Sequence, residues 1–226
     1  TRAEAVKLPV ESANISTVIT VPQDRWVLWA NGPRRGPAVR FWVILVCSLL
    51  AALALGRIPH SPLRTTEWML LVIGLTQVPL PAALLVIGWL FVLAWRGHES
   101  FDRSWSYFNV LQVLLVGLTA MALGILIYAV GAGLLGNPEM FIRGNGSSQL
   151  VLRWYQPRSG TLLPTPGCFS VSIWWYRFLM LLWALWLAAA LIRWLRWGWE
   201  NFSRRGLFTT GRKPPIAPPP PLPTQG

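Results

Sequence analysis

Four long runs of the chain carry no charged side chain: residues 41–56, 68–95, 110–135 and 178–192. All 20 Lys and Arg and all 8 Asp and Glu lie outside these runs. A helix that crosses the hydrocarbon core of a bilayer needs about 20 predominantly apolar residues. The pattern therefore predicts an all-α membrane protein, a bundle of four transmembrane helices at about 38–57, 68–95, 109–135 and 173–197.

The second run is too long for one perpendicular crossing of the bilayer. Its 28 residues would extend about 42 Å as a helix, against a hydrocarbon core of about 30 Å. Pro79 and Pro81 lie in its middle, and proline interrupts the helical hydrogen-bond ladder. We interpret the run as one long helix kinked at the prolines, and the alternative is a re-entrant pair of half-helices. The nearby Gln77 is the side chain best placed to line a pore.

Small residues recur on one face of the third run. Gly117, Gly124 and Gly131 are seven positions apart, and Ala120 lies four positions before Gly124. Small side chains let the backbone of a second helix approach closely in a membrane. We therefore predict that these four residues form a helix-packing face.

Aromatic and basic residues mark both ends of the fourth run. Tryptophan and arginine favour the boundary between lipid and water, because each side chain has an apolar part and a polar tip. The predicted interface anchors are Trp174, Trp175, Arg193, Trp194, Arg196 and Trp197.

Two regions outside the runs are rich in β-branched residues. Residues 1–25 have a strand-like composition, and residues 136–172 contain strand-like stretches between Gly, Ser and Pro turns. We expect the second region to form a small β-hairpin or ordered cap that lies flat over one side of the bundle. An isolated strand pair is marginally stable at best. The partner strands of residues 1–25 are therefore expected upstream of Thr1, in a missing part of a longer chain.

These features divide the chain into three parts. Residues 1–25 form the strand-like segment, residues 26–205 a polytopic membrane domain, and residues 206–226 a basic tail. Seven of the eleven residues from 213 to 223 are proline, a composition that favours polyproline II or disorder.

The distribution of Lys and Arg predicts the orientation of the bundle. With four crossings, the side that holds both termini carries 14 of them and the opposite side carries 6. The positive-inside rule then places both termini in the cytoplasm. With a re-entrant second run each side carries 10, and the N-terminus lies opposite a cytoplasmic C-terminus.

No catalytic or cofactor motif is present, so we predict no enzymatic activity, no cofactor and no metal site. The net charge of +12 lies at the ends of the apolar runs and not on one basic face, which argues against nucleic acid as a partner. The cluster from His98 to Asp102 holds too few ligands for a metal site. Cys47 and Cys168 are expected to be unpaired thiols.

Two stretches resemble a known group of proteins. They are Trp26–Arg57, with the sequence WANGPRRGPAVRFW, and Arg153–Trp199, with RWYQPRSG and WYRFLMLLWALWLAAALIRWLRWGW. Both resemble the C-terminal membrane region of large, uncharacterised bacterial inner-membrane proteins, in which a β-rich exported part precedes the spans. The resemblance implies a bacterial inner (plasma) membrane, a missing N-terminal part and an odd number of crossings. It implies no particular activity.

Together these features favour a non-enzymatic membrane subunit, scaffold or anchor. Its expected partners are the lipid bilayer and either other membrane protein subunits or its own missing upstream domain. The alternative is a channel or transporter component with a path at the broken second run. Ion-coupled transport usually needs Asp, Glu, His or Lys within the membrane, and the four runs contain none.

Overall fold

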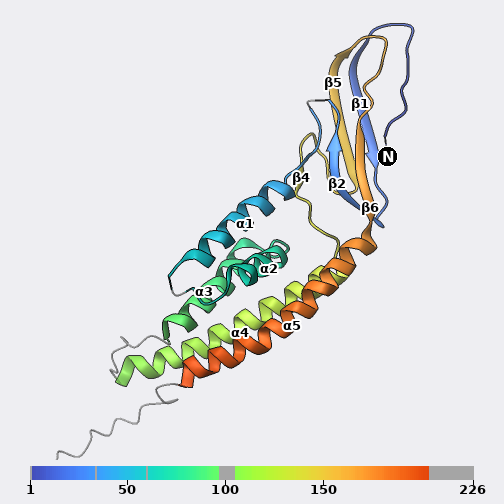
Figure 1. Cartoon of the computed structure of the whole chain (residues 1–226). Coiled ribbons are helices and arrows are strands. Elements are labelled where there is room, and N and C mark those ends of the chain that lie inside the picture. The colour runs from blue at the N-terminus through green and yellow to red at the C-terminus, as the bar shows by residue number, and fades with distance from the viewer. Residues whose placement is uncertain (1, 34, 60, 97–104, 204–226) are drawn as a thin grey trace, which may run out of the picture.

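The computed structural model describes residues 2–33, 35–59, 61–96 and 105–203, with the backbone alone at 105–109. The molecule is elongated, with strands at one end and helices along the rest of its length (Figure 1). The helices are α1 (Phe41–Arg57), α2 (Thr65–Leu75), α3 (Leu80–Arg96), α4 (Trp105–Leu135) and α5 (Ile173–Ser203). The strands are β1 (Ser12–Thr20), β2 (Arg25–Asn31), β3 (Ala38–Val39), β4 (Ile142–Arg143), β5 (Val151–Ser159) and β6 (Gly167–Ser172).

The strands form a small domain of antiparallel pairs, which we call the β-domain (residues 2–33, 35–39 and 140–172). β1 pairs with β5, β2 with β6, and β3 with β4. Side chains from both of the longer pairs meet in one apolar core, made of Val21, Val27, Met140, Ile142, Leu152, Trp154 and Cys168. This core is separate from the core of the helices.

The prediction of an all-α, four-helix bundle is wrong. The described residues form five helices and three antiparallel strand pairs. The expected β-hairpin within residues 136–172 is also wrong, because β5 and β6 pair with β1 and β2 and not with each other. The partner strands that we expected upstream of Thr1 therefore lie downstream, within the same chain. The region also does not lie flat over the bundle, since the strands extend beyond the helix ends (Figure 1).

The second apolar run is two helices and not one kinked helix. α2 ends at Leu75 and α3 begins at Leu80, and the amide nitrogens of Gln77 and Val78 bond back to the end of α2. Pro79 lies in the turn and Pro81 in the first turn of α3, where the missing N–H would have no helical partner. The prediction of one kinked helix is therefore wrong. The structure agrees with the alternative in that the run forms two separate helices.

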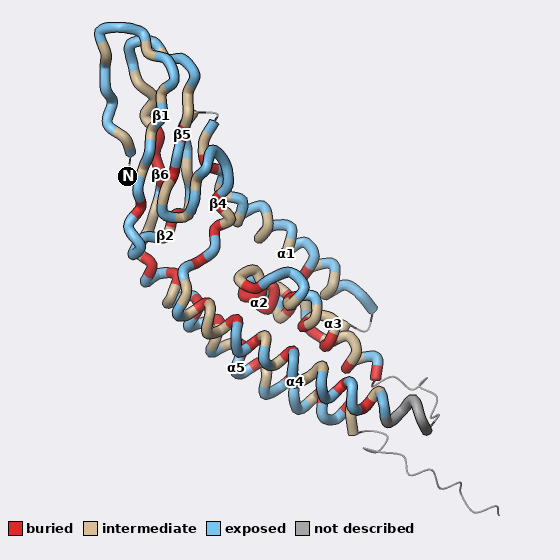
Figure 2. The backbone as a smooth tube through the Cα atoms, turned by 180° about the vertical axis from the view of Figure 1, so that it is seen from behind, coloured by how far each residue is buried: buried red, intermediate tan, exposed pale blue. Residues whose placement is uncertain are grey.

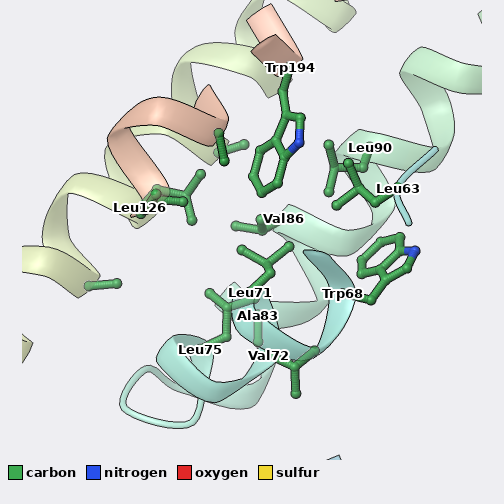
Figure 3. Close-up of a cluster of buried hydrophobic side chains, with 14 of the residues drawn as sticks. Leu63, Trp68, Leu71, Val72, Leu75, Ala83, Val86, Leu90, Leu126 and Trp194 are labelled. Carbon is green, nitrogen blue, oxygen red and sulfur yellow. The ribbon is translucent and has the colours of Figure 1, made fainter. Parts of the chain in front are cut away.

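The helices run back and forth along the molecule. α1 leads away from the β-domain, α2 returns, α3 leads away, α4 returns and α5 leads away again (Figure 1). α1 packs against α2, while α3 packs against α4 and α5. The residues that face the centre are buried and the outer faces are exposed (Figure 2). Between α2, α3, α4 and α5 lies an apolar core that includes Trp68, Leu71, Leu90, Leu126 and Trp194 (Figure 3).

Two of the described helices are long and apolar enough to cross a membrane by length and composition: Val110–Leu135 of α4, and α5. α1 and α3 have 17 residues each and α2 has 11. The prediction of four transmembrane helices is therefore wrong, since only two of the described helices have the length and apolarity of a span. The 11 residues of α2 rise about 16 Å, roughly half of a hydrocarbon core of about 30 Å.

The strand pairing also decides on which end of the helices each loop lies. β1 and β2 precede α1, whereas β5 and β6 lie between α4 and α5. Because these strands pair, the N-terminal segment and the long connection lie at the same end of the helices. α5 ends at the opposite end of the molecule (Figure 1). The four-crossing arrangement, which places the N-terminal segment beside the C-terminus, is therefore wrong.

Candidate functional site: an open face on the long helices

The predicted packing face of α4 is open within the chain. Gly117, Ala120 and Gly124 are exposed, and Gly131 is half-buried. A Cβ atom added at any of the three glycines would meet no other heavy atom within 4 Å. No described helix of the same chain packs closely on these three glycines.

The close helix contacts inside the chain use other glycines, which the sequence spacing did not single out. A Cβ at Gly74 of α2 would lie 1.9 Å from the indole of Trp183, and one at Gly133 of α4 would lie 2.1 Å from Met180 Cε. Trp183 Nε1 also donates to the carbonyl of Leu70, 2.7 Å away. Each contact joins one glycine to one large side chain, and such pairs have no sequence period.

An apolar hollow of about 320 Å³ lies next to the open face. α3 contributes Trp89 and Leu93, α4 contributes a stretch that includes Ala120, and α5 contributes a stretch that ends at Phe202. Thr119 lies in its wall and accepts a hydrogen bond from Trp89 Nε1 at 2.9 Å. Since Thr119 Oγ1 donates in turn to the Leu115 carbonyl, the hollow offers an apolar surface to its surroundings.

The residues proposed for a pore are at the end of the bundle that faces the β-domain. Gln77 Oε1 accepts a hydrogen bond from the backbone nitrogen of Glu139, just after α4, at 3.1 Å. Gln77 Nε2 donates to Thr76 Oγ1 at 3.4 Å. The Gln77 amide therefore connects the α2–α3 turn to the loop that enters the β-domain. Pro79 and Pro81 are exposed at the same turn.

The predicted interface anchors of α5 fall into two groups. Trp174 and Trp175 are exposed, at 69% and 63%, where α5 leaves the β-domain. Near the other end Arg193 and Arg196 are exposed, but Trp194 is buried and Trp197 half-buried. Arg193 forms a 3.0 Å ion pair with Glu67 at the start of α2. The structure thus uses Trp194 in the core of the helices.

Three polar side chains are buried near the far end of the bundle, and the sequence pointed only to Gln112, as a polar residue within the third apolar run. They are Arg96 of α3, Gln112 of α4 and Asn201 of α5, each at most 6% exposed. Leu93 of α3 lies close to Gly198 of α5, so Arg96 and Asn201, one turn further along, lie at a similar level. The spacing of apolar residues does not mark Arg96 and Asn201 as buried, because both lie just beyond an apolar run. Polar residues at such positions usually lie at the membrane surface or in loops.

The candidate metal ligands from His98 to Asp102 lie outside the described residues. Within the described part of the chain, no group of three or more His, Cys, Asp and Glu is placed to hold a metal ion. Cys47 is exposed on α1 and Cys168 is buried in the β-domain, and the two form no disulfide, as expected.

Comparison with known proteins gives no relative from which a role could be taken. No protein-family model, no curated protein and no solved structure matches the chain.

Proposed function

We propose that this chain is a non-enzymatic integral membrane subunit or anchor, in which α4 and α5 cross the bilayer and the β-domain stands outside it. The observation that carries the proposal is the exposed apolar surface of the two long helices. Only 22% of the most apolar stretch of α4 and 28% of that of α5 are buried. The core helix of a water-soluble protein would be mostly buried, and an apolar face this large in water is unfavourable.

The positions of exposed tryptophans support this placement. Trp175 and Trp199 are exposed at opposite ends of α5, and their separation of 24 residues corresponds to about 36 Å along a helix. This distance lies between the thickness of the hydrocarbon core, about 30 Å, and that of the whole bilayer, about 40–45 Å. Tryptophan is enriched at both boundaries of a membrane.

We place the C-terminus in the cytoplasm of a bacterium and the β-domain on the far side of its inner membrane. Six Lys and Arg, from Arg193 to Lys213, follow the apolar part of α5 directly, and cytoplasmic flanks are rich in these residues. The proposed partners of the chain are lipids and other membrane or envelope proteins.

Cysteine labelling tests this topology. In a chain in which Cys47 and Cys168 are replaced by alanine, we expect Ser16→Cys and Thr161→Cys to react with an impermeant maleimide from outside intact cells. Glu200→Cys should react only after the membrane is opened. Labelling of positions 16 and 200 from the same side would contradict the proposal, and a fully water-soluble chain would be labelled at all three positions without a membrane barrier.

Assembly is expected to depend on the open face of α4. Gly117→Leu and Gly124→Leu should each shift the complex, extracted in mild detergent, to the size of the free chain, because a bulky side chain prevents close approach of a second helix. Native gel electrophoresis and sedimentation measure this shift. The fold should survive, since a Cβ at these positions touches nothing within the chain.

Gly88→Leu on α3 is the matched control, because a Cβ there also meets nothing within 4 Å. It should leave the complex intact. If the complex survives both α4 substitutions, α4 is not the contact surface.

A further inference from the structure

One edge of the β1–β5 pair is occupied by the chain itself. The backbone nitrogen of Tyr155 in β5 donates to the carbonyl of Arg35 at 2.8 Å. The backbone nitrogens of Arg153 and Val151 donate to the hydroxyls of Ser147 and Ser148, at 2.9 and 3.3 Å. The edge of β5 that faces away from β1 is therefore hydrogen-bonded from Val151 to Tyr155.

The opposite edge, on β1, has no such partners. In an antiparallel pair, directly opposed residues either exchange both hydrogen bonds or both point away from each other. Ser16, Val18 and Thr20 oppose Tyr155, Arg153 and Val151. Since the latter three point away from β1, the N–H and C=O groups of Ser16, Val18 and Thr20 point away from β5. No described residue bonds to them.

β1 also lacks the features that usually protect an exposed edge. Lysine, proline, bulges and covering loops block pairing with other chains. The strand from Ile15 to Thr20 contains no charged residue and no proline, and Val18 is 52% exposed. By contrast, on the neighbouring sheet Trp42 of α1 donates through Nε1 to the carbonyl of Leu28 in β2, at 2.8 Å. β1 thus lacks partners of the kind that bond to the outer edge of β5 and to the Leu28 carbonyl of β2.

The surface beside this edge is basic. Arg153 lies opposite Val18 and is exposed, and it shares the outward face of β5 with Tyr155, two positions further on. Arg35 packs over the ring of Tyr155, 5.9 Å from its centre, on the same outward side of β5. Neither Arg153 nor Arg35 has an ion pair among the described residues. Side chains of an added strand on the outward face would come within reach of this charge.

From these observations we propose that the β1 edge accepts an extended, acidic segment of another protein as an added strand. Backbone hydrogen bonds to Ser16, Val18 and Thr20 would supply affinity, as in other proteins that bind peptides by strand addition. Carboxylates on the outward face would pair with the arginines. The site lies outside the helices, so it forms a second contact surface in addition to the open face of α4.

A second copy of this chain is a poor occupant. β1 extends away from the helices along the length of the molecule (Figure 1). Two copies in one membrane have the same orientation, so their β1 strands would run in the same direction and could pair only in parallel, which is less stable per residue than antiparallel pairing. This step depends on the proposed membrane placement, whereas the edge itself does not.

Hydrogen exchange on the full chain in detergent micelles tests the proposal. The probe is a ten-residue peptide that alternates threonine and glutamate, used at about 1 mM because single-strand additions are weak. We expect the amides of Ser16, Val18 and Thr20 to exchange at least about ten-fold more slowly with the peptide. The amides of Thr17 and Ile19, already bonded within the ladder, should not change. A threonine–lysine peptide should give no protection.

Val18→Pro removes one outward donor, and no bond to β5 is lost because that N–H faces away. It should abolish the protection of Ser16 and Thr20, whereas the matched variant Val18→Thr should retain it. Slow exchange at Thr17 and Ile19 shows that either variant is folded.

Three results would overturn the proposal. The first is no protection by the acidic peptide, and the second is equal protection by both peptides. The third is slow exchange of Ser16, Val18 and Thr20 without any peptide, and a dependence of that rate on protein concentration would identify a second copy as the occupant.

Discussion

Gly74→Ala is expected to destabilise the helical part of the molecule by about 3 kcal/mol, the upper part of the usual range for overpacking a core. The new Cβ would lie 1.9 Å from Cζ2 of Trp183. That ring is buried, and its Nε1 is held by the carbonyl of Leu70. It therefore cannot move aside without losing its hydrogen bond, and α2 and α5 must separate. Equilibrium unfolding in mixed micelles measures the change.

Gly88→Ala serves as the control for this prediction. Gly88 also lies within an apolar helix, but a Cβ there meets nothing within 4 Å. Replacement of glycine by alanine in a helix is favourable by up to about 1 kcal/mol, so this variant should be as stable as the parent or slightly more stable. Similar losses of stability in the two variants would show that Gly74 is not a contact point between α2 and α5.

Trp154→Ala is expected to unfold the β-domain and leave the helices folded. Trp154 is 2% exposed, and the backbones at Gly32 and Gly36 lie so close to its indole that a Cβ on either would be within 2.6 Å of the ring. Removal of a buried tryptophan side chain costs about 3–5 kcal/mol, and this core contains only a few other large side chains. Limited proteolysis should cut residues 12–31 and 151–172 rapidly.

The matched control is Trp29→Ala. Trp29 is in the same domain, on β2, but is 59% exposed, so its removal creates no cavity. The variant should resist proteolysis as the parent does. Slow cleavage of the Trp154→Ala chain would show that Trp154 is not essential to the core of the β-domain.

The helices could be located from the sequence, but their interruptions were harder to interpret. α4 and α5 fall where two charge-free runs predicted them, because length and apolarity are local properties. The second run has the same local properties along its whole length. Whether Pro79 and Pro81 kink a helix or separate two helices depends on what the turn can bond to. In this fold the amide of Gln77 reaches the backbone of Glu139, a contact across 62 positions.

The spacing of glycines predicted a small-residue face on α4. It could not predict which glycines make the close contacts within the chain. Gly117, Gly124 and Gly131 share a face because the helical period places them there. Gly74 and Gly133 have no such regularity, yet they are the glycines that contact large side chains of α5. The open edge of β1 could not be predicted from the sequence either, because it follows from which strands pair with β1 in the fold.

By itself the sequence determined which segments are apolar, which are strand-like, and that no charge lies within the long runs. Those properties follow from the side chains of neighbouring residues. Only the tertiary structure decided that β1 and β2 pair with β5 and β6, across more than a hundred residues. That pairing places the N-terminal segment and the long connection between α4 and α5 at the same end of the helices. The reason is physical: a strand pattern specifies a backbone edge and an apolar face, and many other strands could satisfy both.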